Sequence, residues 1–181
     1  MKTLIIHPND SSTKFLETIY SKIVDKTVVT GGESADDIIR LIESHDRVMM
    51  MGHGSPYGLF SMGNFNMGSP YVINYMTVPL LRKKDNSVFI WCNADEFVNR
   101  YELKGFYSGM FISEVEEAEY CRLYATDQEL VDESNDGFCE ILSRYVDEDK
   151  HVIYENVKKE YGVIAELNPV ALYNNNRLYI R

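Results

Sequence analysis

The feature that most constrains the fold is a regular alternation between short apolar runs and segments with helical patterning. Five apolar runs have the character of buried strands, and they span residues 3–7, 26–30, 48–52, 87–91 and 106–113. The segments between them repeat apolar residues at spacings of three and four, the pattern of an amphipathic helix. Successive strands joined by helices lie parallel, because each crossover returns the chain to the same edge of the sheet. The sequence therefore predicts a three-layer α/β fold, with a mainly parallel sheet and helices on both of its faces.

Helix signals fill the gaps between the apolar runs. The predicted helices span residues 10–24, 34–44, 75–84, 93–103, 126–146 and 149–161. Ser34 has the position of an N-cap, and the helix over 126–146 is expected to break near Gly137. The tail from Val170 to Ile180 is predicted to form a hairpin or a last edge strand. One domain over residues 1–181 accounts for all of these elements.

Composition excludes several classes of protein. Hydrophobic residues make up 45% of the 181 positions, which is enough to form a core, and the formal net charge is −10. A chain this acidic lacks the positive charge that attracts nucleic acid or an anionic membrane. No apolar run approaches the roughly 18 residues of a membrane span, and the opening segment is too short and too polar for a signal peptide. A cytoplasmic location is expected, without nucleic acid or membrane partners.

Cysteine usage points to reduced thiols. The three cysteines, Cys92, Cys121 and Cys139, are odd in number and have no Cys-x-x-Cys spacing. Neither a disulfide framework nor a structural zinc site is therefore predicted. No His, Asp or Glu near His53 has the spacing of a metal ligand pair, so no metal is expected there.

Two residues with reactive side chains follow two of the predicted strands. His53 and Gly54 come directly after the run 48–52, and Cys92 comes directly after the run 87–91. If these strands are parallel neighbours, both side chains emerge at the carboxyl edge of the sheet, where open α/β folds place their sites. A cysteine hydrolase needs a thiolate, a proton carrier and donors for the tetrahedral oxyanion. Cys92 can supply the thiol, His53 the acid and base, and the amides of Gly54 and Cys92 the oxyanion hole.

This arrangement also resembles a known family. A hydrophobic strand ending in His53 and Gly54, followed by a hydrophobic strand ending in Cys92, is similar to the clan CD cysteine peptidases: caspases, metacaspases, gingipains, clostripain and the CHAT domains. The resemblance covers about Val48 to Phe97. It implies a caspase-like (flavodoxin-like) sheet and a His53–Cys92 dyad that cleaves peptide bonds without a cofactor. A peptide or protein would be the substrate.

Three further residues are candidates for contact with that substrate. Asp95 lies close after Cys92 and can orient a substrate, and Tyr57 lies in the loop that follows His53. Glu114 begins an acidic stretch after the fifth predicted strand, at the same carboxyl edge. A carboxylate there would select a basic residue on the amino side of the scissile bond.

Two other functions compete with the peptidase hypothesis. Trp91 and the Met-rich loop after His53 could close the cleft, which would make the chain an inactive caspase-like binding or scaffold module. A flavodoxin-like nucleotide or flavin binder shares the same order of strands and helices. Gly31 and Gly32 lie between a strand and a helix, but they form neither of the common glycine-rich phosphate motifs.

Overall fold

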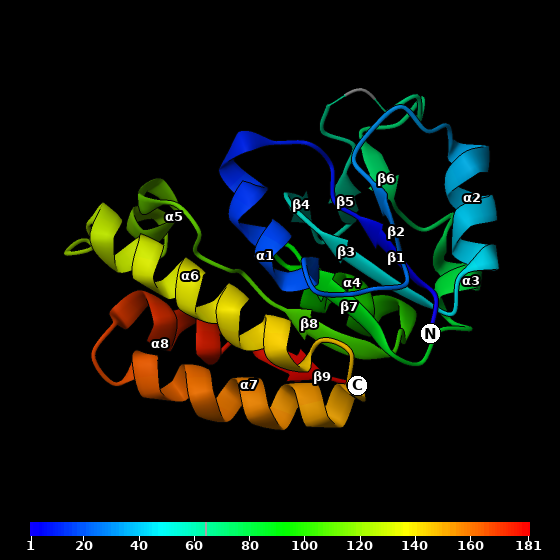
Figure 1. Ribbon diagram of the computed structural model, residues 1–181. Helices are drawn as coiled ribbons and strands as arrows, with labels where there is room; N and C mark the ends of the chain where they lie inside the picture. Colours follow the sequence, from blue (N-terminus) through cyan, green and yellow to red (C-terminus); the bar gives the residue numbers. More distant parts are fainter. Residues whose placement is uncertain (64) are drawn as a thin grey trace.

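The computed structural model describes residues 1–63 and 65–181, and its centre is a mostly parallel six-stranded sheet (Figure 1). In spatial order the strands are β2 (Lys26–Val29), β1 (Thr3–Ile6), β3 (Arg47–Met51), β7 (Ser87–Ile90), β8 (Gly105–Ser108) and β9 (Leu178–Ile180). The first five strands run parallel, and β9 joins β8 antiparallel at one edge. The predicted α/β class with a mainly parallel sheet is confirmed.

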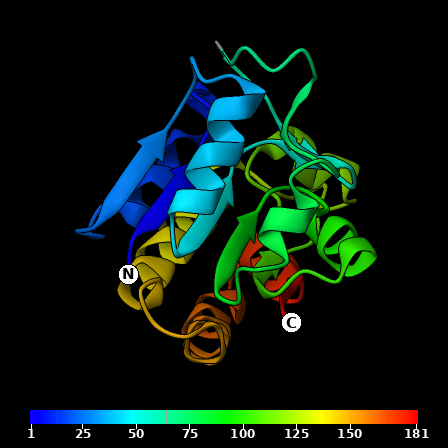
Figure 2. The ribbon, with the colours of Figure 1, turned by 90° about the vertical axis from the view of Figure 1, so that its right-hand side faces the viewer.

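Two hydrophobic clusters hold helices against this sheet. Within β3, Met49 and Met51 belong to one cluster and Val48 and Met50 to the other, because successive side chains of a strand point to opposite faces. The first cluster includes residues of α1 (Glu17–Tyr20), α6 (Gln128–Tyr145) and α7 (Lys150–Ala165). The second includes residues of α2 (Ala35–Ser44), α3 (Val78–Leu81) and α4 (Ala94–Tyr101). Figure 2 places α2 nearest the viewer, with α6 and α7 beyond the strands.

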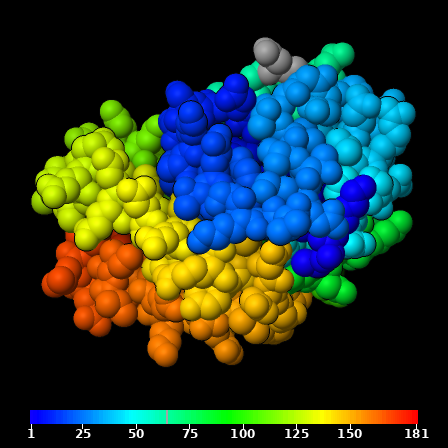
Figure 3. Space-filling model, in the orientation of Figure 1, coloured from blue at the N-terminus to red at the C-terminus, as the bar shows by residue number. Residues whose placement is uncertain are grey.

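The remaining elements lie around the carboxyl edge of the sheet and at the end of the chain. After β3, a small antiparallel sheet forms from β4 (Gly54–Ser55), β5 (Gly58–Phe60) and β6 (Tyr71–Ile73). A 3-10 helix, η1 (Ser11–Leu16), follows β1 and contacts α6, and Figure 3 shows the blue N-terminal residues beside the yellow residues of α6. The third cluster joins α5 (Val115–Tyr120), α6 and α8 (Pro169–Asn175).

Several local predictions were wrong. The first part of the predicted tail hairpin is α8, because Asn168 accepts from the amides of Val170 and Ala171 and Pro169 suits the first helical turn. Only the last three residues before Arg181 form the edge strand β9. Helix α6 continues through Gly137, where a Cβ would lie 2.4 Å from Ile164 Cδ1. That glycine allows α6 and α7 to approach closely, and it does not break the helix.

Two segments are shorter than predicted. The run 106–113 ends as a strand at Ser108, and its last residues form the loop that leads to α5. The predicted helix over 75–84 is reduced to the single turn of α3, with a proline in its first turn. The first change leaves a loop at the carboxyl edge of the sheet, which is where the candidate site lies.

Candidate active site

His53 and Cys92 leave the sheet from adjacent parallel strands. Met51 of β3 is in register with Ile90 of β7, and the amide of Gly52 donates to the Ile90 carbonyl at 3.0 Å. Both residues line one cavity, which we call the dyad cavity; the rest of its lining is Gly52, Ile90, Trp91, Phe111, Ser113 and residues of η1. Its volume of about 20 Å³ is room for a single water molecule and not for a peptide. The structure thus brings the two predicted residues to one small cavity.

The Cys92 thiol is held in its protonated form. Its Sγ lies 3.4 Å from the Phe111 carbonyl oxygen and 3.6 Å from Oε1 of Glu117, and its one proton can be donated to either acceptor. Burial, and then the negative charge of Glu117, raise the pKa of Cys92 to about 12. Because the thiolate is the nucleophile, the thiol in this geometry is unreactive at neutral pH. Cys92 lies between β7 and α4, and Asn93 turns the chain there with a left-handed φ of 65°.

Replacing Glu117 with glutamine should lower the pKa of the Cys92 thiol. The substitution removes a negative charge that opposes the thiolate, while glutamine keeps one acceptor oxygen for the Ser113 and Glu114 amides. We expect Cys92 to be alkylated by iodoacetamide about tenfold faster at pH 8, which corresponds to a pKa lower by about 1. The rate should be followed from pH 6 to 10, with the modified peptide identified by mass spectrometry.

Glu116→Gln is the matched control for that experiment. Glu116 lies on the same helix and is exposed, and it is not among the groups that shift the Cys92 pKa. Its replacement should leave the alkylation profile of Cys92 unchanged. If Glu117→Gln also leaves the profile unchanged, the carboxylate does not control the thiol.

His53 is held on its outer side by a hydroxyl and a carboxylate. Its Nε2 lies 2.7 Å from Ser12 Oγ, and that hydroxyl donates to Asp10 Oδ1 at 2.8 Å. Since the one hydroxyl proton of Ser12 is directed to Asp10, Nε2 of His53 carries a proton and donates to Ser12. The Nδ1 nitrogen then has the free lone pair that a general base needs.

The sequence did not reveal the roles of Asp10 and Ser12 beside His53. Both residues were interpreted only as a helix N-cap, and Asp10 does cap η1 through the Ser12 amide at 2.9 Å. The signal that could have found them is topological: they follow β1, the neighbour of β3, at the same carboxyl edge. The two hydrogen bonds from Ser12 also hold the pKa of Asp10 below its usual value.

Gly54, the predicted oxyanion donor, lies in the β4–β5 hairpin. The Phe60 amide donates to the His53 carbonyl at 2.9 Å, so the next pair, Gly54 and Leu59, is of the non-hydrogen-bonded kind. The Gly54 amide therefore points out of the hairpin. On its other side Gly54 touches Trp91, since a Cβ at Gly54 would lie 2.2 Å from Trp91 Cδ1.

Trp91 is a core residue. It is 1% exposed, it packs edge-on against Phe89 and Phe97, and its Nε1 donates to the Ser55 carbonyl at 3.1 Å. The indole therefore fixes β4, and with it Gly54, on the end of the sheet.

The three candidates for substrate contact have separate locations. Glu114 lines a larger cleft next to the dyad cavity. Asp95 and Tyr57 are not among the described residues that line either space. Tyr57 is 62% exposed with the Arg100 guanidinium 5.2 Å from its ring centre. Burial raises the pKa of Asp95, and its Oδ1 is buried without a partner in the described part of the chain.

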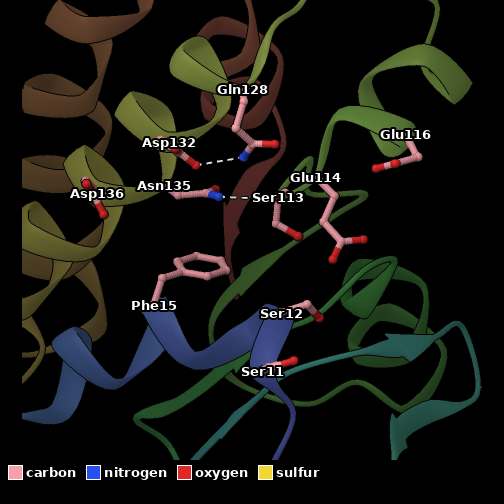
Figure 4. Close-up of a pocket in the computed structure, with 10 residues that line it drawn as sticks. All are labelled: Ser11, Ser12, Phe15, Ser113, Glu114, Glu116, Gln128, Asp132, Asn135 and Asp136. Atoms are coloured by element: carbon pink, nitrogen blue, oxygen red, sulfur yellow. Dashed lines mark hydrogen bonds between the residues drawn. The ribbon is translucent and has the colours of Figure 1, made fainter.

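The cleft that contains Glu114, which we call the acid cleft, has a volume of about 430 Å³ (Figure 4). Its carboxylates are Glu114, Glu116, Asp132 and Asp136. Phe15 and Ser113 line both this cleft and the dyad cavity, so the two spaces adjoin. Ser12, the partner of His53, also lines the acid cleft.

Asn135 is the least exposed polar group of the acid cleft. Its Nδ2 donates to the Ser113 carbonyl at 2.9 Å, as Figure 4 shows. Its Oδ1 is buried and has no partner among the residues that the structure describes. A hydrogen-bond donor from a ligand would satisfy this oxygen.

The other histidines and Cys139 have structural roles. His7 is buried between the Tyr20 hydroxyl at 2.9 Å and the Thr13 hydroxyl at 3.2 Å, and burial lowers its pKa. His45 bridges the Leu41 carbonyl and Thr27, and Cys139 lies in the first core cluster. His151 is exposed on α7.

Neither similarity to known proteins nor another type of site assigns a function to this chain. No protein-family model, curated protein or solved structure matches this chain. Within residues 1–63 and 65–181, no three His, Cys, Asp or Glu side chains are grouped so that they could hold a metal ion. None of the described helices combines the length and the apolar character that crossing a membrane requires.

Proposed function

We propose that this chain is a caspase-like cysteine peptidase in which Cys92 is the nucleophile and His53 the acid and base. The observation that carries the proposal is that the two residues, each at the end of one of two adjacent parallel strands, line one cavity beside a ligand-sized cleft. The parallel strands have the spatial order second, first, third, fourth, fifth, which is the flavodoxin-like order. That order supports the caspase-like arrangement that the resemblance implies.

In the proposed reaction His53 first takes the proton of the Cys92 thiol. The thiolate sulfur forms a bond to the carbonyl carbon of the substrate, and the carbonyl π electrons move to the oxygen, which the Gly54 and Cys92 amides stabilise. When the C–N bond breaks, His53 gives its proton to the leaving amine. A water molecule then attacks the thioester, His53 takes its proton and returns it to the sulfur, and the acid product leaves.

The geometry supports a closed resting state of this site. Cys92 is bound to Phe111 and Glu117, and the dyad cavity excludes a peptide. Catalysis on this proposal requires the thiol to turn away from Glu117 toward His53 and the cavity to open into the acid cleft. Loop movements of this kind control access to the active sites of many enzymes.

The acid cleft supports a preference for a basic side chain in the substrate. Its volume is within the range of small-molecule sites, and it combines carboxylates with Asn135, whose Oδ1 has no partner among the described residues. A guanidinium or ammonium group supplies several donors and a positive charge, and both suit this lining. Glu114, the residue that the sequence suggested for this role, lies in the cleft.

The test is hydrolysis of fluorogenic peptides that carry arginine or citrulline before the scissile bond. Citrulline keeps the shape of arginine without its charge. We expect arginine to be preferred, and Glu114→Gln to reduce that preference about tenfold, because one charge-assisted contact is worth roughly 1–2 kcal/mol. The ratio of kcat/KM for the two substrates is the measurement.

Asp36→Asn is the control for the acid-cleft variant. Asp36 is an exposed carboxylate on α2, outside the lining of the cleft. Its replacement should leave the arginine-to-citrulline ratio unchanged. Equal rates for arginine and citrulline in the unmodified protein would contradict the charge preference, and absence of hydrolysis for every peptide would contradict the peptidase proposal.

The inactive scaffold module is the second candidate function. The observation that favours it is the protonated thiol, whose pKa is raised to about 12 in a cavity of about 20 Å³. On this alternative, acyloxymethyl ketone probes that label active cysteine peptidases would fail to modify Cys92 in a fully folded protein. A flavin-binding role predicts a rise in melting temperature with FMN.

A further inference from the structure

A second large cleft, which we call the arginine cleft, opens on the other side of Cys92. Its volume is about 530 Å³, and its lining consists of Asn93, Met110, Tyr120, Cys121, Arg122, Tyr173 and Arg177. Asn93 directly follows Cys92, and Met110 directly precedes Phe111. Cys92 and Phe111 line the dyad cavity, so in each of these two loops one residue lines the dyad cavity and its neighbour in the chain lines the arginine cleft.

The two guanidinium groups of this cleft form no ion pair with a carboxylate among the described residues, although Arg177 lies near enough to Asp95 for its charge to oppose the rise of the Asp95 pKa. Four other arginines, Arg40, Arg47, Arg144 and Arg181, form ion pairs with carboxylates, and Arg82 and Arg100 form none among the described residues. Although the chain has ten more acidic than basic residues, this cleft is lined by two arginines and no carboxylate.

Arg177 is fixed in place. Its Cζ lies 3.5 Å from the centre of the Tyr173 ring, and its Nη1 donates to the Tyr173 carbonyl at 3.3 Å. A guanidinium stacked in this way loses less side-chain freedom when it binds a ligand. The remaining N–H groups of Arg177 suit an anionic oxygen.

Arg122 has a backbone conformation that normally requires glycine. Its φ is 66°, and it follows the last turn of α5, where the Leu123 amide returns to the Ala118 carbonyl at 2.8 Å. This is the helix-ending motif in which glycine is favoured, because a Cβ is strained there. Asn93, in the same lining, is also left-handed with a φ of 65°. An arginine in this conformation is uncommon, whereas asparagine adopts it routinely.

We propose that the arginine cleft binds a small molecule through its oxyanion group, a carboxylate or a phosphate, held between Arg122 and Arg177. Both groups accept paired hydrogen bonds from a guanidinium. Tyr120 is 82% exposed and offers a planar face to the rest of the ligand. The proposal does not depend on peptidase activity.

The test is titration calorimetry with three probes: inorganic phosphate, adenosine monophosphate and N-acetylglutamate. We expect saturable binding of one ligand per chain for the phosphate probes, for the carboxylate probe or for both, and the pattern identifies the group that is recognised. Affinity should fall at least tenfold in Arg177→Gln and should decrease with salt. Arg40→Gln, which removes a paired surface arginine of α2, should bind as the unmodified protein does.

Arg122→Gly separates ligand binding from structural support. Glycine relieves the left-handed strain, so the melting temperature should rise by about 2 °C while affinity for the probe falls about tenfold. Absence of saturable binding for all three probes would overturn the proposal. So would affinities that are unchanged in both Arg177→Gln and Arg122→Gly. Binding that persists in Cys92→Ala shows that the site is independent of the dyad.

Discussion

Cys92→Ala is expected to reduce the kcat/KM for an arginyl peptide by about a thousandfold or more. On the peptidase proposal, the variant removes the atom that forms the acyl-enzyme, and only binding and the oxyanion donors remain to lower the barrier. Alanine leaves the acceptors of Phe111 and Glu117 without the thiol proton, but Glu117 keeps its bonds to Ser113 and to the Glu114 amide. The fold should therefore persist, and initial rates with matched circular dichroism spectra are the measurement.

His53→Gln should produce a loss of similar size for a different reason. The thiol remains, but no group is left to take its proton and return it to the leaving amine, and a pKa of about 12 prevents ionisation at neutral pH. His151→Gln, at an exposed position of α7, is the control and should leave the rate unchanged. Hydrolysis that survives in Cys92→Ala would assign the activity to another residue or to a contaminant.

Much of the sheet could be predicted from the sequence, because buried parallel strands have a strong signature. The runs that became β1, β3 and β7 are apolar on both faces and end in glycine, proline or a polar residue. The secondary structure of the tail was harder to predict, since the apolar pattern of Val170 to Tyr173 is compatible with either a strand or a buried helix. The choice was made by Asn168 and Pro169, which cap and begin a helix and so place Val170 to Tyr173 in α8.

That His53 and Cys92 would lie at the same edge of the sheet was predictable because both directly follow parallel strands. The state of the thiol was not, since Glu117 lies on α5, after β8 and the loop that follows it, and reaches Cys92 only through the path of that loop. Arg122 also gave no signal in the sequence. Glycine is the residue that marks a left-handed helix end, and a chain with arginine there gives no such mark.

The second large effect is expected at Gly54, where the hairpin after His53 meets the core. Gly54→Ala should lower the free energy of unfolding by about 3 kcal/mol, because the new methyl would lie 2.2 Å from Trp91 Cδ1 and 2.8 Å from the Gly58 carbonyl oxygen. Trp91 is fully surrounded and cannot move aside without displacing Phe89 or Phe97. Urea unfolding followed by tryptophan fluorescence is the measurement.

Replacing Gly162 with alanine should change the free energy of unfolding in the opposite direction. Gly162 lies within α7, and a methyl there would meet Asn175 Nδ2 at 3.5 Å, an ordinary contact distance. Alanine in a helix is more favourable than glycine by roughly 0.5–1 kcal/mol, so Gly162→Ala should stabilise the protein by about that amount. If Gly54→Ala is no more destabilising than Gly162→Ala, then β4 is not held against Trp91. The hairpin that contains Gly54 would in that case have no structural support from the indole of Trp91.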